Sequence, residues 1–255
     1  MIKKHKNLLL CTIIVLLLIS VTSTAFGFQE NGDNFPIVIF EKELIEDKDE
    51  LFERARNKVS DVVNNNNIVS QGFLKEKNSE TKIPLKVYTT TQLYRIEKLP
   101  GGGINTYYAT TNLIEIQSSG GSRDAWKWDE TGGVKAYNTI YYSLKGNKKY
   151  AHFLKGEGGW INYDYPQVSL ANRQVKHGKF GIKEDGGLID EIRRYKPTSN
   201  YSYNTPSHWT YIEAHPLHYF GETTLVDIIA TDGSQWELIL DNDAGSTFSG
   251  DQWAL

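Results

Sequence analysis

From about residue 83 to the end of the chain, short runs rich in Tyr, Thr, Ile, Val and Trp alternate with glycine clusters. The clusters are PGGG at 100–103, SSGG at 118–121, TGG at 131–133, GEGG at 156–159 and EDGG at 184–187. Strand-favouring runs separated by turn residues are typical of antiparallel all-β domains. No amphipathic pattern of helical length interrupts them. We therefore predict an antiparallel β-sandwich over residues 81–255, with a barrel as the second choice, because sequence does not reveal strand order.

The run LVDIIATDGSQWELIL at 225–240 predicts a β-hairpin. Asp232 and Gly233 stand between two apolar runs, and this pair suits the positive φ angles of a tight hairpin turn.

Residues 41–63 carry the one pattern that predicts a helix. Its apolar residues recur at spacings of three, four and seven, and are Leu44, Leu51, Ala55, Val59 and Val62. The asparagines at 64–67 are expected to end the helix, because Asn tolerates turn and left-handed conformations. We interpret residues 26–80 as an acidic helical segment, either a pro-region or a spacer in front of the β domain.

The first 25 residues have the layout of a secretory signal peptide. Lysines at positions 3, 4 and 6 precede an apolar run at 8–19, and Ser23 and Ala25 suit a cleavage site. The apolar run is short for a membrane span, although an uncleaved anchor extended through Phe28 is the alternative. The prediction is a secreted, extracellular protein that touches membrane only through this segment.

The charge of the chain limits the partners that we expect, and its cysteine content bears on disulfides and on the type of organism. Three of the 28 Lys and Arg residues lie before residue 26 and none of the 31 Asp and Glu do, so cleavage leaves a formal charge of about −6. This charge gives no reason to expect nucleic-acid binding. Cys11 is the only cysteine, so the exported chain has no disulfide. Export without cysteine suits a Gram-positive bacterium better than an animal secretory pathway.

Tyrosines crowd the run at 134–144, where successive side chains of a strand alternate between two faces. One face would carry Val134, Ala136, Asn138, Ile140, Tyr142 and Leu144. The other would carry Lys135, Tyr137, Thr139, Tyr141 and Ser143. The first set reads as a core face. The second is polar and holds two rings about 13 Å apart.

Neighbouring segments add more rings, in DAWKWDE at 124–130 and GGWINYDYPQ at 158–167. Each ring alone is best explained by packing, because large aromatic side chains are mostly buried. As a group they exceed what one sandwich buries easily, so we expect some of them to form an exposed contact surface. The candidate ligand-binding residues are Trp126, Trp128, Tyr137, Tyr141, Trp160, Tyr163 and Tyr165.

Catalytic and metal motifs do not emerge from the sequence. It contains no G-x-S-x-G and no H-E-x-x-H, and the exported chain has no thiol nucleophile. His208, His215 and His218 lack the spacing that would converge them on zinc from one strand. DNDAGS at 241–246 lacks most calcium ligands and reads as a turn. We predict no catalytic residue, no metal site and no cofactor.

Two stretches, DETGGVKAYNTIYYS at 129–143 and GGWINYDYPQVSLANRQVKHGKFG at 158–181, resemble segments of small exported proteins of Gram-positive bacteria. KPTSNYSYNTPSHWTYI at 196–212 is similar in style. That group has no assigned activity, so the resemblance implies export and an all-β domain and carries over no active site.

The leading hypothesis is a secreted, non-enzymatic β-domain protein that acts at the cell surface. It would bind a glycan, a cell-wall polymer or a surface protein through its aromatic face. One alternative is a hydrolase of wall or host polymers that uses a carboxylate pair brought together by folding. Another is a secreted toxin or inhibitor with a removable pro-region.

Overall fold

The computed structural model describes residues 35–62, 68–77, 79–117, 133–215 and 217–245. The chain divides into two compact units, Met1–Phe35 and Pro36–Leu255, and the described helix and strands all belong to the second. The predicted signal peptide lies outside the described residues. Among the residues that are described, no helix combines the length and apolar character that crossing a membrane requires.

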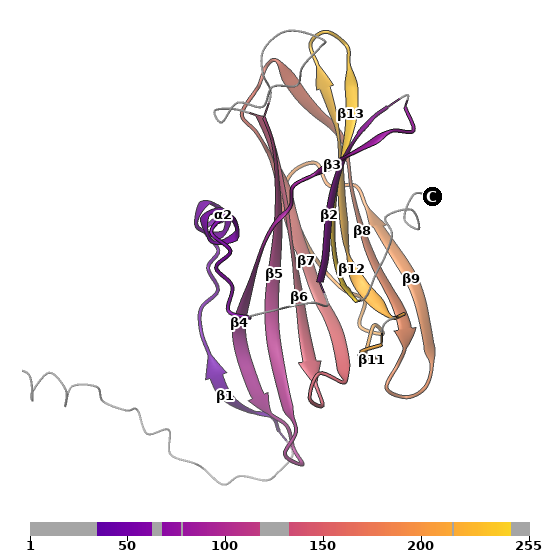
Figure 1. Ribbon diagram of the computed structural model, residues 1–255. Coiled ribbons are helices and arrows are strands. Elements are labelled where there is room, and N and C mark those ends of the chain that lie inside the picture. The colour runs from indigo at the N-terminus through magenta and orange to yellow at the C-terminus, as the bar shows by residue number, and fades with distance from the viewer. Residues whose placement is uncertain (1–34, 63–67, 78, 118–132, 216, 246–255) are drawn as a thin grey trace, which may run out of the picture. The chain divides into compact units, whose positions relative to one another are not determined.

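Thirteen described strands form two antiparallel sheets that pack together without closing into a barrel (Figure 1), so the predicted all-β sandwich is confirmed. Sheet A contains, in spatial order, β1 (Ile37–Glu41), β4 (Tyr88–Lys98), β5 (Ile104–Gln117), β6 (Gly133–Lys145), β7 (Tyr150–Asn162) and β10 (Tyr201–Asn204), while β11 (Ile212–Glu213) also pairs with β7. Sheet B contains β3 (Lys82–Leu85), β2 (Ile68–Glu76), β13 (Gln235–Gly245), β12 (Tyr219–Ala230), β8 (Val168–Ile182) and β9 (Leu188–Tyr195).

The sandwich core has two apolar clusters with a polar belt between them. One cluster includes Ile114, Ala136, Val226 and Leu240. The other includes Tyr108, Ile140, Phe220 and Ala244. Between them along the same strands lie buried polar side chains, which we call the polar belt: Asn112, Asn138, His177, Glu222, Thr224 and Asn242. Side-chain amides of the belt donate to groups on facing strands, such as Asn138 Nδ2 to Thr224 Oγ1 at 3.1 Å.

The strand alternation predicted for 134–144 is observed in β6. The predicted core face points into the sandwich, and its residues are buried except for partly buried Leu144. The predicted hairpin is also present, formed by β12 and β13. Only Gly233 has a positive φ, +86°, and Ala230 N donates to Ser234 O at 3.0 Å, so a three-residue loop replaces the expected two-residue turn.

Two glycine clusters form turns as predicted, but GEGG at 156–159 does not. Gly101 and Gly186 have the positive φ of turn glycines, +86° and +85°. GEGG lies inside β7 instead. A Cβ at Gly156 would collide with the Glu222 carboxylate, and one at Gly158 with the Tyr201 hydroxyl. These glycines therefore make room for the polar belt and do not mark a loop.

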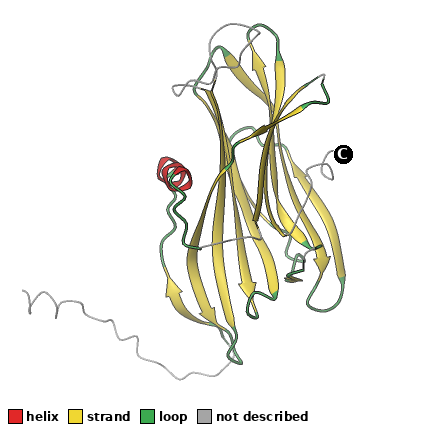
Figure 2. Ribbon diagram, in the orientation of Figure 1, coloured by secondary structure: helices red, strands yellow, loops and turns green. Residues whose placement is uncertain are grey.

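The one described helix, α2 (Lys48–Arg56), is shorter than the predicted span of 41–63. Asp47 caps its N-terminus by accepting from Glu50 N at 3.0 Å, and Lys58, with a φ of +56°, follows its end. Figure 2 shows the helix on the side of sheet A that faces away from sheet B. Phe52 packs against Tyr137 there, with ring centroids 6.0 Å apart.

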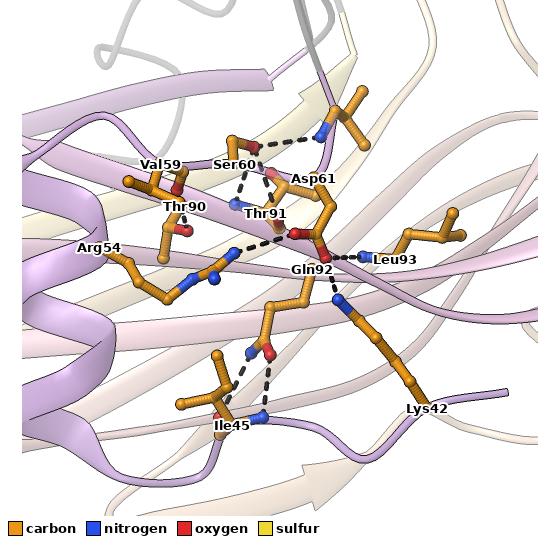
Figure 3. Close-up of polar contacts among 11 residues, drawn as sticks. Lys42, Ile45, Arg54, Val59, Ser60, Asp61, Thr90, Thr91, Gln92 and Leu93 are labelled. Carbon is orange, nitrogen blue, oxygen red and sulfur yellow. Dashed lines mark hydrogen bonds and ion pairs between the residues drawn. The ribbon is translucent and has the colours of Figure 1, made fainter. Parts of the chain in front are cut away.

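Polar contacts tie the segment around α2 to β4 (Figure 3). Asp61 accepts from Arg54 Nη2 and from Leu93 N, each at 3.0 Å, and forms a further ion pair with Lys42. Gln92 exchanges two hydrogen bonds with the backbone of Ile45, at 2.9 and 3.3 Å. We call residues 42–62 the strap.

The segment interpreted as a pro-region or spacer contributes two strands that were not predicted. β1 pairs with β4 at the end of sheet A, and β2 lies inside sheet B between β3 and β13. Removal of residues 26–80 would therefore take β2 out of the interior of sheet B.

Candidate functional site

The structure buries two of the predicted ligand-binding rings. Tyr137 is 3% exposed because the strap covers it, with Phe52 at its edge and Lys48 Nζ 5.3 Å from its ring centroid. Trp160 is 8% exposed and packs in the core 5.7 Å from Tyr201. These two rings are therefore not among the exposed members of the predicted group. Trp126 and Trp128 lie outside the described residues.

Tyr141 is only partly exposed, and its hydroxyl already has a partner. It donates to Glu157 Oε1 at 2.6 Å, while Lys155 Nζ lies 4.6 Å from the ring centroid. Burial and the hydrogen bond to Glu157 raise the pKa of Tyr141. The ring is therefore held in a network on sheet A and is poorly placed to stack on a ligand.

Tyr163 and Tyr165 are exposed, at 53% and 77% of their surface. They lie in residues 163–167, which join β7 to β8 and which we call the aromatic loop. Asn162 Nδ2 donates to Val168 O at 2.8 Å, and Asp164 N donates to Asn162 Oδ1 at 3.0 Å. These bonds close the base of the loop, so the two rings are displayed from a fixed support.

Further contacts hold the loop against β6. Tyr163 N donates to Gly133 O at 2.9 Å, and Lys135 Nζ lies 4.9 Å from the Tyr163 ring centroid. The aromatic loop also lies beside the β12–β13 turn, because Thr231 N donates to Gln167 O at 3.0 Å.

A polar pocket of about 280 Å³ opens on sheet B. It is lined by Lys77, Asn172, Arg173, Gln174, Lys196, Asp227 and Glu237. It forms at a β-bulge, where the pairing of β8 with β12 shifts between Leu225 and Asp227. Asn172 adopts a φ of +49° at this bulge, in the left-handed region. We call this the bulge pocket.

Two carboxylates line the bulge pocket. Asp227 and Glu237 are directly opposite each other in the β12–β13 pair, an arrangement that costs stability unless cations compensate it. Lys77 Nζ and Asn172 Nδ2 both contact Asp227 Oδ2, at 2.6 and 2.7 Å. Asp227 is therefore already ion-paired with Lys77 and hydrogen-bonded by Asn172. Sequence reasoning missed the pocket because its residues come from three strands, β8, β12 and β13, and from the positions that directly follow β2 and β9.

The polar belt holds another acid–base pair, but it is closed to solvent. His177 Nε2 lies 2.7 Å from Glu222 Oε2, and both side chains are completely buried. Burial raises the pKa of Glu222, although hydrogen bonds from His177 and Tyr201 act in the opposite direction. With no access for a substrate, this pair is a structural element of the core.

Asp241 and Asp243 overturn the reading of DNDAGS as a turn, because both lie in β13. They are two residues apart on one face of the strand and are buried. Burial raises the pKa of both carboxyls, and for Asp243 the neighbouring Asp241 adds to the effect. Nothing in the sequence pattern separates such a run from a polar turn.

The histidines of HWTYIEAHPLH lie apart. His208 Nε2 is 2.7 Å from Glu191 Oε1, whereas His215 and His218 pack with ring centroids 5.0 Å apart. In the part of the chain that the structure describes, no group of three or more His, Cys, Asp or Glu side chains is placed to hold a metal ion.

Comparison with known proteins assigns no family to the chain and no role to these residues. The chain matches no protein-family model, and no curated protein or solved structure is similar to it.

Proposed function

We propose that this is a secreted, non-enzymatic protein that acts at the cell surface by binding a glycan or a cell-wall polymer through its aromatic loop. The observation that carries the proposal is the exposure of Tyr163 and Tyr165, at 53% and 77%, on a loop closed by hydrogen bonds. Aromatic side chains that are exposed, and so do not serve as core packing, commonly mark binding sites.

The construction of the loop favours binding. A tyrosine side chain offers a flat apolar face and a hydroxyl group. It loses little conformational entropy when it binds a ligand, because it has few rotatable bonds. Because Asn162, Asp164 and Val168 fix the base of the loop, ordering it on a ligand costs little further entropy. Sugar rings present flat C–H faces that stack on such rings, with hydroxyl groups at their edges.

A pull-down of the secreted full-length chain on purified Gram-positive cell wall tests the proposal. Replacing Tyr163 and Tyr165 together by Ala should weaken binding at least tenfold, and soluble wall sugars should compete with the wild-type protein. Leu188→Ala is the matched control, because Leu188 is 66% exposed and lies beyond the far end of β8. Equal binding by the double variant and the wild type would refute the role of the loop.

A second candidate function is hydrolysis of a wall or host polymer, favoured by the opposed Asp227 and Glu237 in the bulge pocket. Directly opposite residues of an antiparallel pair have Cβ atoms about 4.5–5.5 Å apart. Glycosidases that retain configuration hold their two carboxyl groups about 5 Å apart.

Release of new reducing ends from wall polysaccharide would support hydrolysis if Glu237→Gln and Asp227→Asn each abolish it. Lys98→Ala, a change on sheet A, should leave the rate unchanged. Binding without any release of product would exclude this second function.

A further inference from the structure

The bulge pocket lies within reach of a polymer held at the aromatic loop. Val168 follows the loop directly, and Asn172 is four residues further along β8, about 13 Å at the rise of a strand. On β12, Asp227 lies three residues before Ala230, which pairs with Val168. An oligosaccharide of three or four sugar units spans this distance.

The basic side chains that line the pocket differ in whether they form an ion pair. Lys77 is paired with Asp227 at 2.6 Å. Arg173 and Lys196 form no ion pair with any acid among the described residues, and both line the pocket. Glu237 is the remaining acid, so the unpaired charges of the lining sum to a positive value in a chain whose formal charge is −3.

Arg173 is also held in place. Its guanidinium carbon lies 5.7 Å from the Trp160 ring centroid, and its Nη1 donates to Leu170 O at 3.2 Å. One edge of the guanidinium is fixed by these contacts, and its Nε and Nη2 groups form no hydrogen bond with the described residues. A guanidinium fixed in this way is suited to an oxyanion, because its planar donors match the two oxygens of a carboxylate or phosphate.

We propose that the bulge pocket binds the acidic group, a carboxylate or a phosphate, of a glycan whose neighbouring sugars stack on the aromatic loop. Arg173 and Lys196 contact the acidic group, Glu237 accepts hydrogen bonds from sugar hydroxyls, and the Gln174 amide donates to them or accepts from them. This inference rests on the proposed binding function and specifies its ligand as an acidic glycan.

Calorimetric titration of the full chain with hexagalacturonic acid, its fully methyl-esterified form and short poly(glycerol phosphate) tests the inference. The two hexasaccharides share sugars and length and differ in charge. An acidic probe should bind at least tenfold more tightly than the esterified one, and rising salt should weaken this preference. The two acidic probes distinguish a carboxylate from a phosphate as the preferred group.

Variants separate this inference from the proposed function. Arg173→Gln and Lys196→Ala should each reduce the preference for the acidic probe about tenfold, the loss expected of one charge-assisted interaction, and should leave wall-glycan binding by the loop detectable. Lys98→Ala is the control for a change of charge outside the pocket. Thermal unfolding verifies that Arg173→Gln is folded, and exposed Lys196 provides a variant that does not depend on that result.

Equal affinity of the wild-type protein for the acidic and the esterified probes overturns the inference, even if Tyr163 and Tyr165 prove essential for wall binding. Loss of all binding in the tyrosine double variant, with the charge preference of the wild type established, supports both. If the Tyr163 and Tyr165 double variant binds neutral wall sugars as tightly as the wild type does, the proposed function alone is refuted.

Discussion

His177 Nε2 and Glu222 Oε2 lie 2.7 Å apart at the centre of the sandwich, where neither side chain reaches solvent. Tyr201 OH donates to the other oxygen of Glu222, at 2.5 Å, and contacts Thr224 Oγ1 at 2.7 Å. The pair explains why the facing strand β7 carries glycine at 156, since any larger residue would enter the space of the carboxylate.

Gly156→Ala should therefore destabilise the protein by about 2–4 kcal/mol, through overpacking and loss of the Glu222 hydrogen bonds. Urea unfolding followed by tryptophan fluorescence measures the change. Gly103→Ala is the matched control, because its added methyl would only touch Leu99 at ordinary contact distance, and its cost should stay below about 1 kcal/mol. Equal effects of the two variants would contradict the packing described for the polar belt.

His152 should contribute a loss of stability as the pH is lowered from 6.5 to 4, opposite in sign to the contribution of the buried carboxyls Glu222, Asp241 and Asp243, whose pKa values are raised. Burial, followed by the charge of Lys179, lowers the pKa of His152 to about 4, from 6.5 when unfolded. The unfolded chain then binds a proton in this window that the native state does not, so acid favours unfolding. The loss should be about 2 kcal/mol after allowance for partial exposure.

Urea unfolding at several pH values tests this expectation, with His152→Gln as the comparison. The variant should lose less stability than the wild type between pH 6.5 and 4. Below pH 4 both should lose stability together, because carboxylates with lowered pKa values, such as Glu115 and Glu157, then become protonated in the native state. Parallel curves over the upper window would exclude His152 as the source.

The free energy of unfolding should rise with pH between 7 and 10.5 because of Lys179. Burial lowers the pKa of Lys179 to about 7, although its Nζ donates to the backbone carbonyls of Trp209 and Thr210. The unfolded chain binds one more proton than the native state in this window, which gives a slope of up to about 1.4 kcal/mol per pH unit. Lys179→Met should flatten the slope, and a flat profile in the wild type would contradict a neutral buried amine.

Asp61→Asn should loosen the strap without unfolding the sandwich. Burial raises the pKa of Asp61, but hydrogen bonds from Lys42, Leu93 N and Arg54 outweigh this and lower it below its ordinary value. The amide keeps the shape and loses the charge, at a cost of about 1–2 kcal/mol. Limited proteolysis should cut within residues 42–62 faster in the variant, while the cores of β5–β7 stay protected. Glu53→Gln, on the exposed side of α2, is the control.

Strand β1 should promote self-association. All five of its residues are exposed, with Ile39 at 56%, and it lies at the end of sheet A. Apolar edge strands template the pairing of other chains, and a lysine on such a strand opposes it. Ile39→Lys should raise the concentration at which light scattering detects association, whereas Leu217→Lys, also on an exposed apolar residue, should change it little.

The sequence by itself determined the class of fold and the local pairing. The alternation of β6 and the turn between β12 and β13 depend on strand geometry and on glycine, and both can be read from neighbouring residues. Which residues share a face of a strand follows from a period of two. Tyr163 and Tyr165 of the aromatic loop were also among the candidates, as part of a group of rings larger than one sandwich buries easily.

Only the tertiary structure decided what covers each face. Tyr137 and Tyr141 were correctly placed opposite the core residues of β6, yet the strap buries the first and Glu157 holds the second. GEGG reads as a turn until the Glu222 carboxylate is placed against it. The bulge pocket joins residues that are up to 160 positions apart, from Lys77 to Glu237. Local periodicity reports the direction of a side chain, whereas burial and the assembly of a site depend on distant segments brought into contact by packing.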